Sequence, residues 1–525
     1  MLHILAFTAL VQQDRLQIDP LLLVQAAEVW SVIGRKDNPV WPGWDARNTP
    51  ILVYFPGKQD VLINHPKPPD GFKRYTGAIQ SPIGPIFVKD GPTIKDIDGQ
   101  NTSAVVGGIG TLVVADTLST RRQWVEGLAG QLAEHPENAT KIITDGLFPN
   151  PCNSMTVFAH EAFHVYQEKL APNKSAKELD VLKYPALSVE NNVGFALESD
   201  FLAEAAKART AAEARAVAVK WLATRKWRRA GLSDASTRYE DGNEFNEGLA
   251  EYVQYKLLEC LQSKTPSREM WLVQGFQGYG DLQPQRDQMV RQMQMALTGQ
   301  MNVNNDPYGA SPVRFRLYFS GMAIGAMLDR LGAKWHDPML KTDATLTSLV
   351  EKAVYATPEE LERARAEVQS STRFKELMGL KLKLAKDGEA HIQKVLEGFD
   401  SCPGELAIDY SKAAKPAVGF VFTPFGVLRV SDDQTVYRLI PMRGRVGSLT
   451  IAEDGARPVL HDQRAKVVRY QLTAAPEEAA ILRQIGSGGL KAVDAKTLAL
   501  PGVTLGNVKG TLRIEGRKVT LIVAD

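Results

Sequence analysis

The chain has 525 residues, a net charge of +2, and hydrophobic and charged fractions of 44% and 23%. This is the composition of an ordinary globular protein of several domains, and a charge so near zero gives no reason to expect nucleic acid or an anionic membrane as a partner. The three cysteines, Cys152, Cys260 and Cys402, are too few and too far apart for a disulfide framework or a cysteine-based zinc site.

The first residues leave two interpretations open. The apolar run from Leu2 to Val11 resembles the core of a secretory signal, which favours export to the periplasm or the extracellular space. The run lacks a basic stretch before it and a clear cleavage site after it, so a helix turn in a cytoplasmic protein is the alternative. No other run is long and apolar enough to span a bilayer, and we therefore expect no integral membrane segment.

Residues 18–120 have the pattern of an N-terminal α/β region. Hydrophobic spacing predicts a helix over 19–33 and strands over 51–55, 60–63 and 83–89. A further β-run extends from Val105 to Asp116. We expect it to be either an edge strand that holds an extended substrate through main-chain hydrogen bonds, or an internal strand of the sheet.

Residues 121–403 have the pattern of a mainly helical domain, and its first anchor is His160-Glu161-Ala162-Phe163-His164. No Gly or Pro occurs from Met155 to Leu170, so the segment is predicted to be helical. Residues four apart share a helix face, so His160 and His164 can bind one ion while Glu161 lies beside them. Two buried core histidines with no metal are the alternative.

The metal would need a third protein ligand. The third histidine of metzincins is missing, because Gln167 and Leu170 stand where that motif has Gly and His. Asn246-Glu247-Gly248-Leu249-Ala250-Glu251 lies on a predicted helix, and Glu247 and Glu251 share one face of it. One of these carboxylates could bind the ion while the other accepts the free N–H of a ligating histidine.

Together the two motifs resemble those of the gluzincins, the thermolysin- and aminopeptidase-like zinc peptidases. The resemblance implies His160, His164 and Glu247 as Zn²⁺ ligands, Glu161 as general base and Glu251 as partner of a ligating histidine. It covers the two helices well and the rest of the chain poorly. The interval between the motifs is much longer than in the best-known relatives, and a helical insertion over 188–229 would account for it.

This Ala-rich insertion offers two rival third ligands, Glu198 and Glu204, although surface glutamates are common on such helices. It ends in a basic cluster, Lys220 to Arg229, which we expect to be a solvated helix face. Gluzincins often supply a further donor to the oxyanion from a Tyr or His after the third ligand. Tyr308, in a predicted turn, and Tyr318, near the start of a predicted helix, are the candidates, with simple packing roles as the alternative.

Residues 404–415 are expected to form a domain boundary, and residues 416–525 a mainly-β domain, a β-sandwich or small barrel, with His461 on its surface. The predicted fold class is thus α+β: a gluzincin-like core of mixed sheet and helical subdomain, followed by this domain. The predicted function is zinc-dependent cleavage of a peptide or protein substrate, with another amide or ester as a second possibility. The alternative from a different class is a catalytically inert zinc-site or scaffold protein whose β domain binds a partner.

Overall fold

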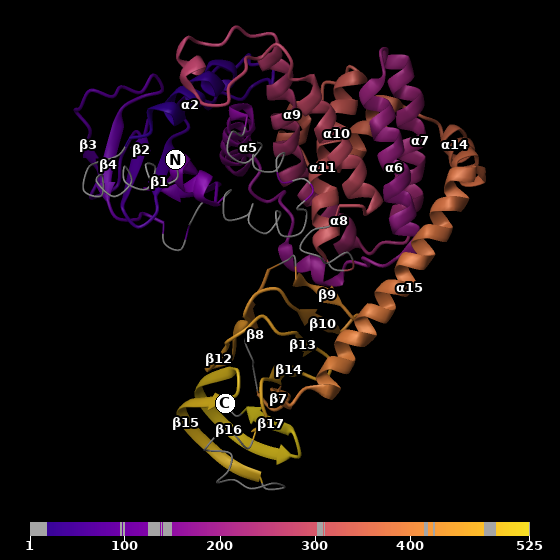
Figure 1. Cartoon of the computed structure of the whole chain (residues 1–525). Coiled ribbons are helices and arrows are strands. Elements are labelled where there is room, and N and C mark those ends of the chain that lie inside the picture. The colour runs from indigo at the N-terminus through magenta and orange to yellow at the C-terminus, as the bar shows by residue number, and fades with distance from the viewer. Residues whose placement is uncertain are drawn as a thin grey trace. The chain divides into compact units, whose positions relative to one another are not determined.

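The computed structural model describes residues 18–94, 97, 100–123, 137, 139, 150–301, 308, 310–413, 418–423, 426–476 and 490–523. The apolar run Leu2 to Val11 therefore lies outside the described residues. The architecture is α+β with a β-rich C-terminal region, as predicted (Figure 1). Among the described residues, none of the helices has the length and apolar character needed to cross a membrane.

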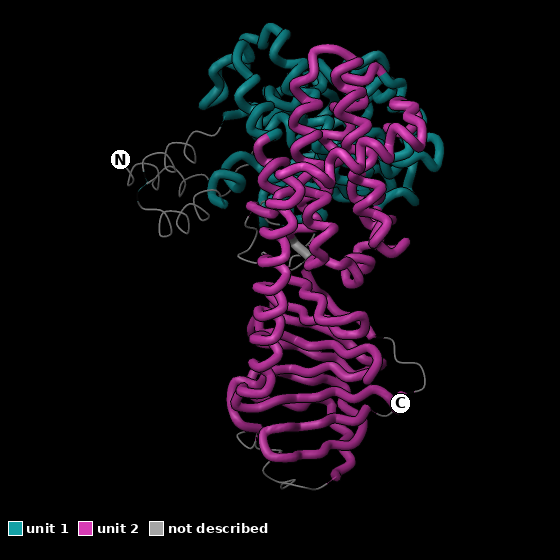
Figure 2. The backbone as a smooth tube through the Cα atoms, turned by 90° about the vertical axis from the view of Figure 1, so that its right-hand side faces the viewer, with its two compact units in different colours: residues 1–175, 245–290, 333–349 teal, residues 176–244, 291–332, 350–525 magenta. Residues whose placement is uncertain are grey.

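The chain divides into two compact units, each made of several segments (Figure 2). Unit 1 comprises residues 1–175, 245–290 and 333–349, and unit 2 comprises residues 176–244, 291–332 and 350–525. This division differs from the three consecutive regions predicted from the sequence, because the chain leaves unit 1 after residue 175 and returns to it at residue 245.

Unit 1 contains a six-stranded mixed sheet with the order β3-β4-β2-β1-β6-β5. Its strands are β1 (Ile51–Phe55), β2 (Gln59–Ile63), β3 (Lys73–Arg74), β4 (Ile86–Asp90), β5 (Thr102–Val106) and β6 (Ile109–Ala115). The predicted run Val105 to Asp116 is thus broken into two strands by the Gly107-Gly108 turn. Since β6 lies between β1 and β5, it is internal, and the strand at this edge of the sheet is β5.

Three helices of unit 1 pack around α5 (Pro151–Leu170): α2 (Pro20–Ile33), α9 (Leu249–Gln262) and the short α12 (His336–Lys341). Helix α5 begins where Asn150 caps it by accepting the backbone N–H of Cys152, with Pro151 in the first turn. The predicted helix over Met155 to Leu170 lies within it.

An aromatic cluster joins α5 and α9. Trp41 is fully buried, and its ring centroid lies 4.6 Å from that of Phe163 on α5 and 5.1 Å from that of Trp335. Tyr252 on α9 packs edge-on to both tryptophans. Each aromatic pair contributes about 0.5–1.5 kcal/mol beyond simple burial, so the two helices have a well-defined separation.

Unit 2 is built from helices and a large sheet. The helices and helical segments that begin and end within it are η3 (Glu178–Lys183), α6 (Val189–Lys207), α7 (Ala211–Arg229), α8 (Asp234–Asn243), α11 (Ala310–Arg330), α14 (Pro358–Ser370) and α15 (Thr372–Ser401). Three elements run across a boundary between the units: η4 (Glu244–Gly248), a π-helical turn, together with α10 (Gln283–Thr298) and α13 (Leu346–Val354).

The C-terminal strands form one hydrogen-bonded sheet of eleven described strands. They are β7 (Gly404–Asp409), β8 (Val418–Val421), β9 (Leu428–Arg429), β10 (Gln434–Tyr437), β11 (Arg443–Val446), β12 (Leu449–Glu453), β13 (Val459–Asp462), β14 (Val467–Leu472), β15 (Leu490–Leu500), β16 (Val503–Glu515) and β17 (Lys518–Val523). The long strand β16 pairs with β15 on one side and, on the other, with β12 near its start and β17 near its end.

Two expectations for this region need correction. The segment 404–415 was predicted to be a boundary, yet its first six residues form β7, a buried strand paired between β14 and β17. The six residues of β7 are followed directly by a turn, so in the sequence they resemble a linker. Their strand character becomes clear only from their pairing with β14 and β17. His461 is not on the surface: it is 7% exposed on β13, and its Nε2 lies 2.8 Å from the hydroxyl of Tyr410.

The basic cluster Lys220 to Arg229 is not a solvated helix face as a whole. Arg225 and Arg228 on α7 are fully buried, and Glu198 on α6 is buried between them. The remaining charged members of the network are Glu240 and Asp241 on α8, Glu244 at the start of η4, and Arg229. The sequence could not reveal this burial, because an ionic side chain enters a core only where an opposite charge on another element meets it.

Candidate metal centre

Three side chains of unit 1 place ligand atoms around one point. The Nε2 atoms of His160 and His164 on α5 lie 3.1 Å apart. A carboxylate oxygen of Glu247, in η4 just before α9, lies 3.7 Å and 3.5 Å from these two nitrogens. These residues form the group among the described residues that could hold a metal ion.

The size of this triangle suits a tetrahedral ion. Two ligand atoms bonded at about 2.0–2.1 Å with tetrahedral angles lie about 3.3 Å apart, whereas octahedral neighbours at the same bond length lie about 2.9 Å apart. The three observed separations scatter around the tetrahedral value. Three protein ligands on one side leave a fourth position open for water or a substrate oxygen.

Opposing effects on the pKa values keep Glu247 in the form that binds a cation. Burial would raise the pKa of the Glu247 carboxyl, but hydrogen bonding to His160 and His164 outweighs burial and holds it well below its usual range. Burial raises the pKa of Glu251. The pKa values of the two carboxyls are thus pushed apart, with that of Glu247 the lower.

Burial alone would lower the pKa of His160. Its carboxylate neighbours Glu247, Glu251 and Glu161 act in the opposite direction and raise it above the ordinary value. The centre therefore has an excess of negative potential, which favours a cation at this position.

Two glutamines, neither foreseen from the sequence, orient the histidines. Gln167 Oε1 lies 3.0 Å from Nδ1 of His164, and its Nε2 donates to the carbonyl oxygens of Phe245 (2.5 Å) and Asn246 (3.3 Å). Gln167 thus ties the ring of His164 to the backbone just before Glu247. Asn246 in turn donates to the second carboxylate oxygen of Glu247 at 3.3 Å.

Two side chains of α9 approach Nδ1 of His160. Glu251 Oε1 is 3.9 Å from Nδ1 of His160, beyond hydrogen-bond distance, whereas Gln254 Nε2 is 2.9 Å away. The oxygen and nitrogen of a side-chain amide occupy nearly equivalent positions, so Gln254 can turn its oxygen to accept the N–H of a metal-bound His160. Gln254 shares a helix face with Glu247 and Glu251, a spacing that could have identified it.

Val165 of α5 packs against the β5–β6 hairpin, since its Cγ1 would be only 2.9 Å from a Cβ at Gly110 on β6. Gly110 thus allows the hairpin to approach α5 closely. Glu161 lies one helical turn before Val165, and residues four apart share a helix face, so Glu161 is on the same face of α5 as Val165.

The β5 edge offers main-chain groups for pairing. Gly107 and Gly108 have φ values of +55° and +81°, those of a two-residue type I′ turn closed by Val106 and Ile109. Alternation along an antiparallel ladder then directs the N–H and C=O of Val105 away from β6. The Val105 side chain is 65% exposed, and within the described residues β5 pairs with β6 alone.

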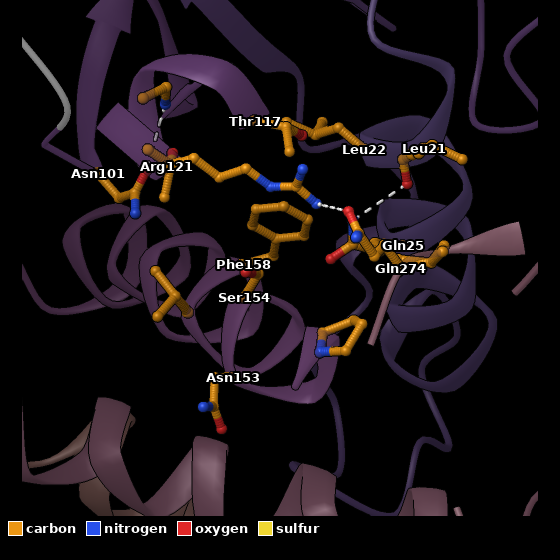
Figure 3. A pocket seen from close by; sticks show the side chains of 15 residues that line it. Leu21, Leu22, Gln25, Asn101, Thr117, Arg121, Asn153, Ser154, Phe158 and Gln274 are labelled. Atoms are coloured by element: carbon orange, nitrogen blue, oxygen red, sulfur yellow. Dashed lines mark hydrogen bonds between the residues drawn. The ribbon is translucent and has the colours of Figure 1, made fainter. Parts of the chain in front are cut away.

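A cavity of about 170 Å³ lies at the N-terminal end of α5, one turn before Glu161 (Figure 3). Its walls come from α2, the end of β6, the segment 117–121, the first turns of α5 and residues 273–274. Phe158 and the guanidinium of Arg121 project into it, and Arg121 donates to Oε1 of Gln274 at 2.9 Å. The cavity thus combines apolar walls with polar groups.

The rival third ligands are not part of the centre. Glu198 in unit 2 is fully buried and accepts three hydrogen bonds from Arg225 and Arg228, so its charge is already compensated. Glu204, also on α6, is exposed. Of the three carboxylates considered from the sequence, Glu247 is the one that lies beside His160 and His164.

Tyr308 and Tyr318 both belong to unit 2. The ring of Tyr308 lies 5.1 Å from that of His391 on α15 and packs against the cluster around Phe399. Tyr318 on α11 stacks near Phe315 and under the guanidinium of Arg314. Their roles as oxyanion donors stay predictions.

Comparisons of this chain with protein-family profiles, with curated proteins and with solved structures found no match.

Proposed function

We propose that the protein is a zinc-dependent hydrolase of the gluzincin type that cleaves peptide bonds, with a core of mixed sheet and helices like theirs. The observation that carries the proposal is the triangle of His160, His164 and Glu247, whose separations suit a tetrahedral ion with an open position. Two imidazoles and one carboxylate are the ligand set of catalytic zinc in this family.

The residues around the ligands support catalysis over a purely structural role. When bound, zinc lowers the pKa of water and polarises a carbonyl oxygen. Glu161 would take the proton from the attacking water and deliver it to the leaving amine. A structural metal site needs no such base and has four protein ligands, whereas the described residues supply three here.

A peptide is the favoured substrate because of the β5 edge. An extended peptide pairing with Val105 would make main-chain hydrogen bonds that are the same for every sequence, beside the face of α5 that carries Glu161 and Val165. The cavity one turn before Glu161 would then accept a substrate side chain.

The first test is metal content, measured by elemental analysis after reconstitution with zinc. We expect about one zinc per wild-type chain, its loss in Glu247→Gln, and its retention in the matched control Glu204→Gln, which removes an exposed carboxylate. A wild type that binds no zinc would refute the metal centre.

The second test separates an enzyme from an inert zinc protein. Glu161→Gln should keep its zinc and lose about 10²–10⁴-fold in the cleavage rate of a peptide library, because the general base is gone. Equal cleavage by wild type and Glu161→Gln, or none by either with zinc in place, would contradict the peptidase and favour the scaffold alternative.

A further inference from the structure

Two buried cations of unit 2 form no ion pair with the described residues. They are Arg316 on α11 and Lys381 on α15, which are 3% and 9% exposed. By contrast, the neighbouring guanidiniums of Arg225, Arg228 and Arg229 are paired with the carboxylates of Glu198, Glu240, Glu244 and Asp241. Arg316 and Lys381 therefore lack a carboxylate partner in the described part of the chain.

Both cations end at the same turn. Lys381 Nζ donates to the carbonyl of Thr298, the last residue of α10, and Arg316 Nε donates to that of Ala296 at 3.3 Å. The Nη1 of Arg316 is buried and has no hydrogen-bond partner among the described residues. The two side chains thus converge on the C-terminal end of α10, with a donor left over.

Gly299 lies between them. A Cβ at this glycine, whose φ is +76°, would lie 3.3 Å from Nη2 of Arg316 and 3.7 Å from Nζ of Lys381. Among the described residues other than the glycine and its chain neighbours, no further heavy atom comes within 4 Å of that position. The position is therefore bounded by two cationic nitrogens, where an oxygen atom of an anion would have two donors.

Capping of α10 does not account for both charges. The C-terminus of a helix carries about half a negative charge, and two full positive charges converge on it here. Burial, followed by repulsion from Arg316 and Arg373, lowers the pKa of Lys381 to about 8, and burial lowers that of Arg316 to about 10. Arg373 itself is paired with Asp200. An added anion would relieve both the burial cost and the repulsion.

We propose that Arg316, Lys381 and the turn at Gly299 form a binding site for a dianionic oxyanion, namely a phosphate group. The charge of a dianion suits these two cations, neither of which forms an ion pair with the described residues, and charge-assisted N–H···O bonds would satisfy the free donor of Arg316. The site lies wholly in unit 2 and is independent of the proposed hydrolase activity.

The test is titration of the full-length protein with inorganic phosphate by isothermal calorimetry at constant ionic strength. We expect one saturable site per chain and at least 10-fold weaker binding in Lys381→Met and in Arg316→Met. The matched control is Lys383→Met, which removes a largely exposed lysine from the same helix and should leave the affinity unchanged. Acetate, a monoanion, should bind more weakly than phosphate.

Thermal unfolding separates an anion site from a purely structural cap. For an anion site, phosphate should raise the unfolding midpoint of the wild type and of Lys383→Met, but not that of Lys381→Met. For a cap alone, Lys381→Met would lower the midpoint equally with and without phosphate, and that result would overturn the proposal. Failure of the wild type to bind phosphate saturably would overturn it as well, whether or not the variants fold.

Discussion

The substitution Glu198→Gln tests whether this glutamate stabilises the fold through buried ion pairs or acts as a metal ligand. Its carboxylate is fully buried and accepts hydrogen bonds from Arg225 Nε (3.0 Å), Arg225 Nη2 (2.8 Å) and Arg228 Nε (2.7 Å). The amide would keep the shape of the side chain and remove its charge. Removing one partner of a buried ion pair costs about 3–5 kcal/mol, because the remaining charges stay buried without compensation.

The assay is urea unfolding followed by tryptophan fluorescence. Trp221 is a local reporter, since it is fully buried and lies 4.5 Å from the guanidinium of Arg225. With a denaturant dependence of about 1–3 kcal/mol per molar, the unfolding midpoint should fall by about 1 M or more. Glu204→Gln, an exposed change on the same helix, should alter stability by less than about 0.5 kcal/mol.

The same variant should bind metal like the wild type, in contrast to Glu247→Gln. A loss of metal from Glu198→Gln while the protein remains folded would refute the assignment of Glu247 as third ligand. A destabilisation below about 1 kcal/mol would refute the reasoning about the buried network, since it would show that Arg225 and Arg228 do not depend on this carboxylate.

Two further predictions follow from single contacts. Gln167→Leu should weaken zinc binding by about 10–100-fold in competition with a chelator, because His164 loses the acceptor that fixes its ring; a change of less than twofold would contradict this role. The second prediction concerns the free energy of unfolding, measured with urea in phosphate-free buffer. The difference in this free energy between the wild type and Lys381→Met should increase by about 1.5 kcal/mol in favour of the wild type from pH 8 to pH 9.5. The pKa of Lys381 is about 8 in the folded protein, which is below its value in the unfolded chain. Between pH 8 and pH 9.5 the unfolded chain therefore binds more protons, and raising the pH favours the folded state. A difference in unfolding free energy that stays flat or falls with pH would contradict this.

The sequence predicted local features with helical periodicity well. The spacing of His160 and His164 fixes their common face once the segment is helical, and α5 is a helix because it has a cap, an initial proline and no glycine. The proximity of Glu247 could be proposed only through the resemblance of a short motif. Its distance from the histidines depends on the packing of α5 on α9, which no local pattern encodes.

The polar partners of the centre could not be predicted in the same way. Gln167 has an uninformative position in the sequence, and its role comes from two carbonyl groups of a segment about 80 residues later in the chain. Gln254 was within reach of the sequence, since it shares a helix face with Glu247, but a glutamine gives no chemical signal comparable to that of a carboxylate.

The sequence by itself thus determined the helix that carries His160 and His164, and which side chains this helix presents together, because these depend on interactions over a few residues. Only the tertiary structure decided that β6 is internal, that β7 belongs to the C-terminal sheet, and that Glu198 forms buried ion pairs with Arg225 and Arg228. Strand order and the pairing of buried charges join residues far apart in the chain, and their free energy exists only once those elements are packed.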